Sequence, residues 1–272
     1  MRQARLSFIG AGNIANAIIS GLIHQDMSPK NIIVADPAEN QLAPFRELGV
    51  AATLDNLEAI SQSDVVILSV KPNVLPGVAR DIAEAVTDGK PLVISVAAGI
   101  TLTSLSEWFG NQLALVRCMP NTPALVQLGA TGLFANDNVT AEQKDLAEQI
   151  VNAVGLSVWM EEESQLDAVT ALSGSGPAYF FYIIEIMSQI GIKMGLTSEC
   201  SRKLVLQTAL GAATMAMQST DEPADLRRRV TSPGGTTAAA LQSMQHSNLA
   251  DIFEAAIQAA HERSVELSRD VE

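Results

Sequence analysis

The sequence is poor in cysteine and in basic residues. Its two cysteines, Cys118 and Cys200, have neither metal-binding nor redox spacing, which favours a reduced, cytoplasmic chain with no metal site. Only 17 residues are lysine or arginine against 30 aspartate or glutamate, so the net charge is −13. The basic patch that nucleic acid or an anionic membrane surface requires is missing, and we expect neither partner. The most apolar segment, 178–196, contains Glu185 and Lys193 and is a poor membrane span.

Familiar catalytic motifs are absent as well. The sequence contains no G-x-S-x-G, no H-E-x-x-H and no G-x-x-x-x-G-K-[ST]. Its three histidines, His24, His246 and His261, stand in no recognisable catalytic string, and we expect them at the surface or at an interface. These absences narrow the range of reactions that the sequence suggests.

A glycine-rich stretch close to the N-terminus is the most informative motif that is present. The apolar run 6–9 leads into Gly10-x-Gly12-x-x-Ala15, followed by an apolar helix. Gly10 permits a tight turn, Gly12 lets the backbone approach a pyrophosphate, and the small Ala15 lets the helix pack closely on the strand. Unpaired N–H groups and the helix dipole favour an anion there, so the motif predicts a dinucleotide site.

An acidic residue ends the second apolar run, 31–36. Asp36 stands where a carboxylate can accept hydrogen bonds from the adenosine ribose of a dinucleotide. It could equally cap a helix that begins near Ala38. The sequence leaves both roles open.

Apolar runs alternate with helical segments through the first 163 residues. Strands are predicted near residues 6–9, 31–36, 50–52, 64–70, 91–99, 113–119, 131–134 and 157–159. Helices are expected from residues 13, 38, 56, 73 and 141. This alternation predicts an α/β fold with an N-terminal Rossmann-like, doubly wound sheet.

The ends of four predicted strands share small or turn-forming residues. They are Gly10-Ala-Gly12, Ser69-Val-Lys71-Pro72, Ala97-Ala-Gly99 and Met119-Pro-Asn121. In a doubly wound sheet the ligand lies outside the carboxyl ends of the strands, where small residues leave room for it. The pattern therefore favours a cofactor over simple loop punctuation.

The acidic run 161–163 marks a predicted seam, after which strand patterns vanish. We expect residues 1–163 to form the dinucleotide-binding domain and 164–272 an all-helical domain. Segments 179–187 and 204–217 are apolar nearly all round and must be buried, yet about a hundred residues cannot cover several such helices. A two-fold homodimer with intertwined helices, or a higher homo-oligomer, would cover them.

Two small-residue loops are predicted before helices in this second half. In the segment 173–177 we expect a tight turn, with Gly174 and Gly176 serving packing. The segment 232–237 places a glycine turn at a helix start, together with the hydroxyls of Ser232, Thr236 and Thr237. Successive N–H groups in such a turn form a site for a carboxylate-sized anion.

The hydroxyls and N–H donors of these loops suit the reduction of a C=N bond better than a reaction at a hydroxyl group. A dehydrogenase acting on a hydroxyl needs a base, usually His, Lys or Tyr, whereas a protonated imine already accepts hydride readily. A site of hydroxyls and N–H donors therefore favours C=N reduction. A related cyclic-imine or hydroxy-acid reductase and a non-catalytic dinucleotide-sensing protein remain the alternatives.

Motifs along nearly the whole chain resemble those of the pyrroline-5-carboxylate reductases, which make proline from a cyclic imine. The motifs are Phe8-Ile-Gly-Ala-Gly-Asn13, Ser69-Val-Lys-Pro72, Ser95-Val-Ala-Ala-Gly99, Arg117-Cys-Met-Pro-Asn-Thr-Pro123, Asp167-Ala-Val-Thr-Ala-Leu-Ser-Gly-Ser-Gly-Pro-Ala-Tyr179 and Val230-Thr-Ser-Pro-Gly-Gly-Thr-Thr237. The last two are highly specific. The resemblance implies NAD(P)H-dependent reduction of 1-pyrroline-5-carboxylate to L-proline by a dinucleotide domain, a dimerisation domain and an active site with parts of both subunits.

The resemblance also assigns residues. The cofactor-lining residues would be Gly10, Ala11, Gly12, Asn13, Ile14, Asn56, Ser69, Val70, Lys71, Pro72, Ala97, Ala98, Gly99, Met119 and Asn121, to which Asp36 is added from its strand end. Ser232, Gly235 and Thr236 would hold the substrate carboxylate, the Thr237 hydroxyl would meet the ring nitrogen, and Ser175 is a further candidate hydroxyl. Members often prefer NADPH. Asp36 departs from the neutral or hydroxyl residue frequent at that strand end, so the choice between NADPH and NADH stays open.

Overall fold

A computed structural model describes residues 4–269 of the chain. By its internal contacts the chain divides into two compact units, Met1–Ser175 with Ala260–Glu272, and Gly176–Ala259. This division falls later than the seam predicted at residue 163, and it returns the C-terminal residues to the first unit. Each unit is described by itself below.

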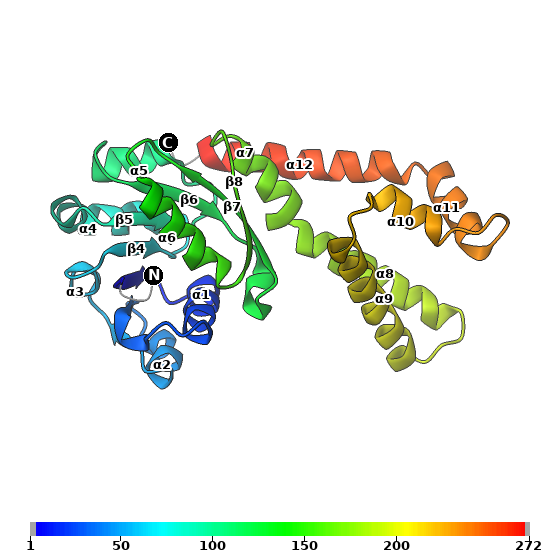
Figure 1. Ribbon diagram of the computed structural model, residues 1–272, viewed down its shortest axis with the longest axis horizontal. Coiled ribbons are helices and arrows are strands. Elements are labelled where there is room, and N and C mark those ends of the chain that lie inside the picture. The colour runs from blue at the N-terminus through cyan, green and yellow to red at the C-terminus, as the bar shows by residue number, and fades with distance from the viewer. Residues whose placement is uncertain (1–3, 270–272) are drawn as a thin grey trace. The chain divides into compact units, whose positions relative to one another are not determined.

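The first unit is built on an eight-stranded sheet in the order β3-β2-β1-β4-β5-β6-β7-β8 (Figure 1). The strands are β1 (Leu6–Ile9), β2 (Ile32–Ala35), β3 (Ala51–Thr53), β4 (Val65–Leu68), β5 (Leu92–Ser95), β6 (Leu115–Met119), β7 (Gly129–Ala135) and β8 (Gly155–Trp159). All eight predicted strands are confirmed. The order reverses at β1 and β4, so the Rossmann-like, doubly wound fold is confirmed too.

Helices cover both faces of this sheet. They are α1 (Asn13–His24), α2 (Glu39–Glu47), α3 (Asn56–Ile60), α4 (Leu75–Gly89), α5 (Leu102–Phe109), α6 (Ala141–Asn152) and α7 (Gln165–Val169), with short turns η1 (Pro29–Asn31) and η2 (Thr122–Val126). One apolar core joins α1, α2 and α6 to alternate strand residues such as Phe8 and Ile67. The other joins α3, α4 and α5 to the opposite set, such as Ile9 and Leu68. Strands buried on both faces explain the continuous apolar runs of the sequence.

Every neighbouring strand pair is parallel except β6 and β7. Only residues 120–128 separate these two strands. A parallel return would need a crossover of roughly a dozen residues or more, so this short connection can only turn the chain back antiparallel.

In place of the tight turn predicted for the segment 173–177, two helices meet there at a single bend, Ser175. The π-helix η3 (Thr170–Gly174) follows α7 and leads into α8 (Gly176–Lys193). Its wide turn is held by the Ser175 N–H, which donates to the Thr170 carbonyl at 2.8 Å. A Cβ on Gly174 would lie 2.5 Å from the Met119 methyl, so the packing role predicted for this glycine is confirmed.

A close contact explains why α7 belongs with the sheet. A Cβ on Gly132 of β7 would lie 2.8 Å from the Val169 side chain, so only a glycine lets α7 settle there. The units consequently divide after this helix rather than at the acidic run 161–163.

The second unit contains only helices. They are α8, α9 (Ser198–Gln218), α10 (Pro223–Arg229), α11 (Thr236–His246) and the first part of α12 (Leu249–Arg269). Helices α8 and α9 pack side by side through a small-residue contact in which the Ser201 hydroxyl donates to the Ser188 carbonyl at 2.8 Å (Figure 1).

Large apolar side chains cover the surface of these helices. Phe180, Phe181 and Tyr182 are each more than 60% exposed, and Met194 and Met217 are about 80% exposed. Within residues 4–269, no helix is both long and apolar enough to cross a membrane. A single chain thus leaves uncovered the apolar faces that the sequence predicted to be buried.

Candidate active site

The glycine turn after β1 has a conformation that only glycine adopts easily. Gly10 has φ +105°, and a Cβ added to it would lie 2.8 Å from the backbone of Ser69 and Val70. The Ser69 hydroxyl donates to the carbonyls of Gly10 at 2.7 Å and Ile9 at 3.0 Å. The ends of β1 and β4 are therefore locked together at the point where the strand order reverses.

The start of α1 is open to an anion. Gly12 occupies the N-cap position, and no side chain among the described residues caps this helix. Gly12 and Asn13 are exposed, Ile14 is half-buried and Ala15 is buried against the core. The first-turn N–H groups and the helix dipole thus fit a pyrophosphate, which is the arrangement that a dinucleotide requires.

Asp36 lies beside this turn. One carboxylate oxygen accepts the Ala11 N–H at 2.9 Å and the other accepts the Ala38 N–H at 2.9 Å. The cap residue of α2 is Ala38 itself, so Asp36 supports the start of that helix from two positions before the cap and does not cap it directly. A carboxylate oxygen can accept more than one hydrogen bond, so a ribose contact stays compatible with this geometry.

The other predicted cofactor residues follow the carboxyl ends of their strands. Asn56 opens α3 after β3, Ser69 to Pro72 follow β4, and Ala97 to Gly99 follow β5. Lys71 and Ala98 are exposed, whereas Ala97 and Gly99 are buried. The parallel sheet brings these segments to one edge, as expected.

Asn121 is placed differently from the rest. Its side chain is buried, donates to the Ser173 carbonyl at 2.9 Å and accepts the Ala130 N–H at 2.9 Å. Its amide is thereby engaged in joining β7 to η3. Met119, at the end of β6, is half-buried with its methyl against Gly174.

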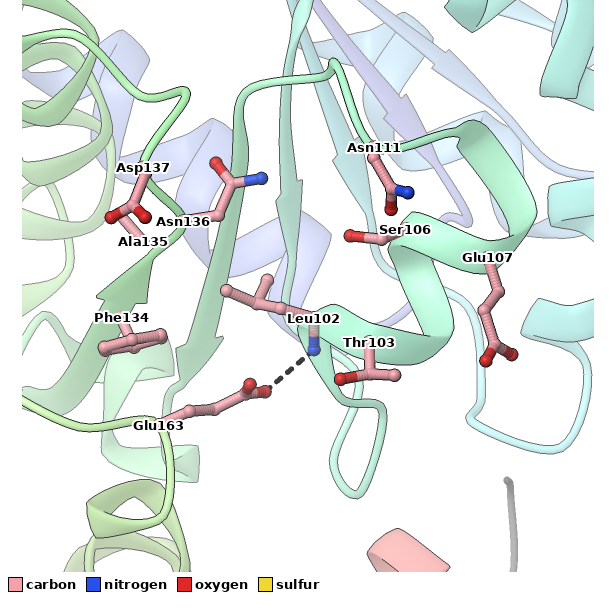
Figure 2. A pocket seen from close by; sticks show the side chains of 10 residues that line it. All are labelled: Leu102, Thr103, Ser106, Glu107, Asn111, Phe134, Ala135, Asn136, Asp137 and Glu163. Atoms are coloured by element: carbon pink, nitrogen blue, oxygen red, sulfur yellow. Dashed lines mark hydrogen bonds between the residues drawn. The ribbon is translucent and has the colours of Figure 1, made fainter.

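A cleft of about 560 Å³ opens beside the start of α5 (Figure 2). Glu163 lies in it, and one of its carboxylate oxygens accepts both the Leu102 N–H at 2.8 Å and an Arg117 N–H at 2.9 Å. Arg117 is buried, so this pair joins β6 to the start of α5. The remaining lining residues are Thr103, Ser106, Glu107, Asn111, Phe134, Ala135, Asn136 and Asp137.

The sequence pattern did not predict the ion pair between Arg117 and Glu163. Arg117 interrupts an otherwise apolar strand, and a charge buried there requires a partner. That rule could have directed attention to the acidic run 161–163. It could not have selected Glu163 from the three glutamates.

The second predicted site, in the other unit, also lies at an open helix start. Gly235 is the N-cap of α11, with no side-chain cap among the described residues, and Gly234 before it has φ +70°. Thr236 and Thr237 form the first turn of α11. Within residues 4–269 the Ser232, Thr236 and Thr237 hydroxyls make no hydrogen bond to another residue. Open N–H groups beside three hydroxyls fit a small carboxylate.

None of the cysteines or histidines is among the residues predicted to line these sites. Burial raises the pKa of the Cys118 thiol, which keeps it protonated and unreactive. His24 and His246 lie at the far ends of α1 and α11, and His261 lies within α12.

Comparison with known proteins agrees with this architecture. Residues 163–267 match the family model described as pyrroline-5-carboxylate reductase dimerisation, and residues 5–99 match the one described as NADP oxidoreductase, coenzyme F420-dependent. A pyrroline-5-carboxylate reductase of Pseudomonas aeruginosa is 47% identical over 100% of this chain and 99% of its own. One of Vibrio alginolyticus is 42% identical over 99% of both chains.

Solved structures give the same result. A pyrroline-5-carboxylate reductase from Coxiella burnetii has a TM-score of 0.94 and 43% identity, covering 97% of this chain and 98% of that one. A pyrroline carboxylate reductase of Plasmodium falciparum with NADP bound has a TM-score of 0.87 and 30% identity, covering 98% and 99%. The sequence similarity and the fold thus extend over the full length, and the chain belongs to the pyrroline-5-carboxylate reductase family.

Proposed function

We propose that this chain reduces 1-pyrroline-5-carboxylate to L-proline with NADPH or NADH, the last step of proline biosynthesis. The observation that carries the proposal is the 47% identity over the whole chain to a pyrroline-5-carboxylate reductase. NADPH or NADH, when bound, supplies the hydride that the carbon of the C=N bond accepts. The chain must therefore hold the dinucleotide, orient the cyclic imine and stabilise its ring nitrogen.

The glycine turn and the start of α1 hold the dinucleotide in this proposal. The N–H groups of Gly12, Asn13 and Ile14 bind the pyrophosphate, because they are the accessible donors at an uncapped helix start. Asp36 and Asn56 flank the adenosine half, while Ala97 to Gly99 and Met119 flank the nicotinamide half. The hydrogen bond from the Ser69 hydroxyl to the Gly10 carbonyl keeps the turn fixed. The N–H donors of the turn therefore need not reorganise when the pyrophosphate binds.

The start of α11 holds the substrate. The Thr236 N–H, at the uncapped helix start, and the Ser232 hydroxyl bind the carboxylate of the imine, because an N–H donor and a helix dipole favour an anion. The Gly235 N–H donates to the Ser232 carbonyl at 3.0 Å, so Gly235 contributes by shaping the turn around the carboxylate. The Thr237 hydroxyl then hydrogen-bonds the ring nitrogen. A threonine hydroxyl is a very weak acid, so we assign it to orienting an imine that is already protonated. Ser175 is the second candidate for the hydroxyl that contacts the ring nitrogen.

The functional form in this proposal is a homodimer, with the active site completed by both subunits. Its support is the match of residues 163–267 to a dimerisation family model and the exposed apolar surface of α8 and α9. A second copy would bury that surface, which otherwise faces water at a cost of about 25 cal/mol per Å².

A cofactor-oxidation assay tests the proposal against its rivals. The purified protein is mixed with NADPH or NADH and the cyclic imine, and the fall in reduced-cofactor absorbance is followed. We expect turnover with 1-pyrroline-5-carboxylate and formation of L-proline. Turnover only with a hydroxy acid or another imine would replace the proposed substrate, and cofactor binding without turnover of any of them would indicate a sensing protein.

A further inference from the structure

The loop between β5 and α5, residues 96–101, is held at three points within the first unit. At its start the Val96 N–H donates to the Leu68 carbonyl at 3.1 Å. At its end the Leu102 N–H donates to Glu163 at 2.8 Å, as Figure 2 shows. Between these points Gly99, with φ +75°, lies against the backbone of Leu267 in α12.

A side chain at Gly99 would crowd α12, and Leu267 would have to shift by a few tenths of an ångström to accept it. A Cβ there would lie 3.3 Å from the Leu267 carbonyl oxygen and 3.5 Å from its Cβ. The last turns of α12 therefore press on the middle of the loop, and Ala98 beside it stays exposed at the sheet edge. Small residues here serve the approach of α12 as well as that of a cofactor.

A buried hydrogen bond fixes these turns of α12. The Ser264 hydroxyl donates to the Asp167 carboxylate of α7 at 2.7 Å, and both residues are buried. Asp167 lies in the helix that packs on Gly132 of β7, so Ser264 is anchored to the sheet itself. Moving Ser264 would move Leu267, one turn later in the same helix.

We propose that Glu163 and the anchored end of α12, through Ser264 and Leu267, hold the loop 96–101 in the shape that presents Ala97 to Gly99 to the nicotinamide half of the cofactor. This inference rests on the cofactor placement given under Proposed function. The adenosine half lies over β1 and β2, where Asp36 is, so the loop after β5 faces the other half. Ser264, Asp167 and Glu163 are then positioning residues.

The test separates the two halves of the cofactor. Two ligands are titrated into each full-length variant: NADPH, and 2′-phospho-ADP-ribose, which lacks the nicotinamide ring. The variants are Ser264→Ala and Glu163→Ala. Their matched controls are Ser268→Ala, whose hydroxyl bonds only its own helix, and Glu161→Ala, an exposed neighbour in the acidic run.

We expect both test variants to bind NADPH about 10-fold more weakly while binding 2′-phospho-ADP-ribose as tightly as the unaltered chain. Their kcat should fall by about 10- to 100-fold, because a small misplacement of a reacting ring is costly. The primary isotope effect with 4-deuterated NADPH should rise. Glu163→Gln retains an oxygen that accepts the Leu102 N–H and should recover part of the loss.

Two results would overturn the inference. One is an unchanged NADPH affinity in Ser264→Ala. This variant removes no charged group, so it can be measured even if Glu163→Ala, which leaves Arg117 without its partner, does not fold. The other is an equal loss for both ligands, which would indicate general loosening. Because binding alone decides these outcomes, failure of the unaltered chain to reduce the imine would refute the proposed function and leave this test standing.

Discussion

The carboxylate of Asp36 accepts the N–H of Ala11 at 2.9 Å, which joins the end of β2 to the glycine turn after β1. Asp36 is thus part of the scaffold of the glycine turn. It also places a negative charge where the adenosine ribose is expected. These two roles have separable consequences.

We expect Asp36→Ser to raise kcat/KM for NADPH relative to NADH. A carboxylate near a 2′-phosphate is repelled, and a close charge pair is worth about 1–4 kcal/mol depending on the local dielectric. Steady-state kinetics with both cofactors measure the ratio. Asp36→Asn removes the charge but keeps one acceptor oxygen, and Asp88→Asn, at the end of α4, controls for net charge. An unchanged ratio in Asp36→Ser would leave Asp36 with its structural role only.

Gly10→Ala should destabilise the glycine turn after β1. The added Cβ would lie 2.8 Å from the Ser69 and Val70 backbone, at φ +105°, and such strain costs about 1–3 kcal/mol. The free energy of unfolding and the NADPH affinity should both fall. Gly77→Ala, in α4 with open space around the new methyl, is the control and should be neutral or slightly stabilising. Equal behaviour of the two variants would contradict the geometry of the turn.

Ile186→Glu should prevent assembly of the dimer. Ile186 lies on α8 among the exposed apolar side chains, and burying an unpaired charge there costs several kcal/mol against a total stability of about 5–15 kcal/mol. Light scattering should show loss of the folded dimer. Gln218→Glu adds the same charge at a polar position ending α9 and should leave assembly intact. If the unaltered chain were an active, monodisperse monomer, the proposed homodimer would be wrong.

Thr237→Ala should lower kcat/KM for the imine. A hydrogen bond to a charged partner is worth roughly 1.5–3 kcal/mol, which corresponds to about 10- to 150-fold. A loss near 10⁴-fold would instead indicate essential acid catalysis. Thr237→Ser keeps the hydroxyl and should retain most activity, with cofactor affinity unchanged in both variants.

The matched control for this prediction is Thr214→Ala. The Thr214 hydroxyl bonds the Leu210 carbonyl of its own helix, so its removal should leave kinetics unaltered. If Thr237→Ala kept the kcat/KM of the unaltered chain, Thr237 would have no part in the mechanism. Ser175 and Ser232 would then be tested in the same way.

The sequence by itself determined the strands, the glycine turn and the helix start at Gly235. Each depends on short-range chemistry: continuous apolar runs require cover on both faces, and glycines at positions such as Gly10 permit a backbone that other residues resist. The same local rules missed α5, Leu102–Phe109, whose apolar residues mix with threonine and serine. Its N-cap bond, from the Ser104 N–H to the Thr101 hydroxyl, is a local feature that could have revealed it.

Only the tertiary structure decided which distant groups meet. It gave Asp36 two N–H partners, paired Arg117 with Glu163, and returned α12 so that Ser264 reaches Asp167. Except for the local bond between Asp36 and Ala38, these contacts join residues 25 to 97 positions apart. Their partners are selected by how whole elements pack rather than by neighbours in sequence. The fold alone therefore decided that Glu163, of three adjacent glutamates, pairs with Arg117. It also decided that α12 packs against Gly99.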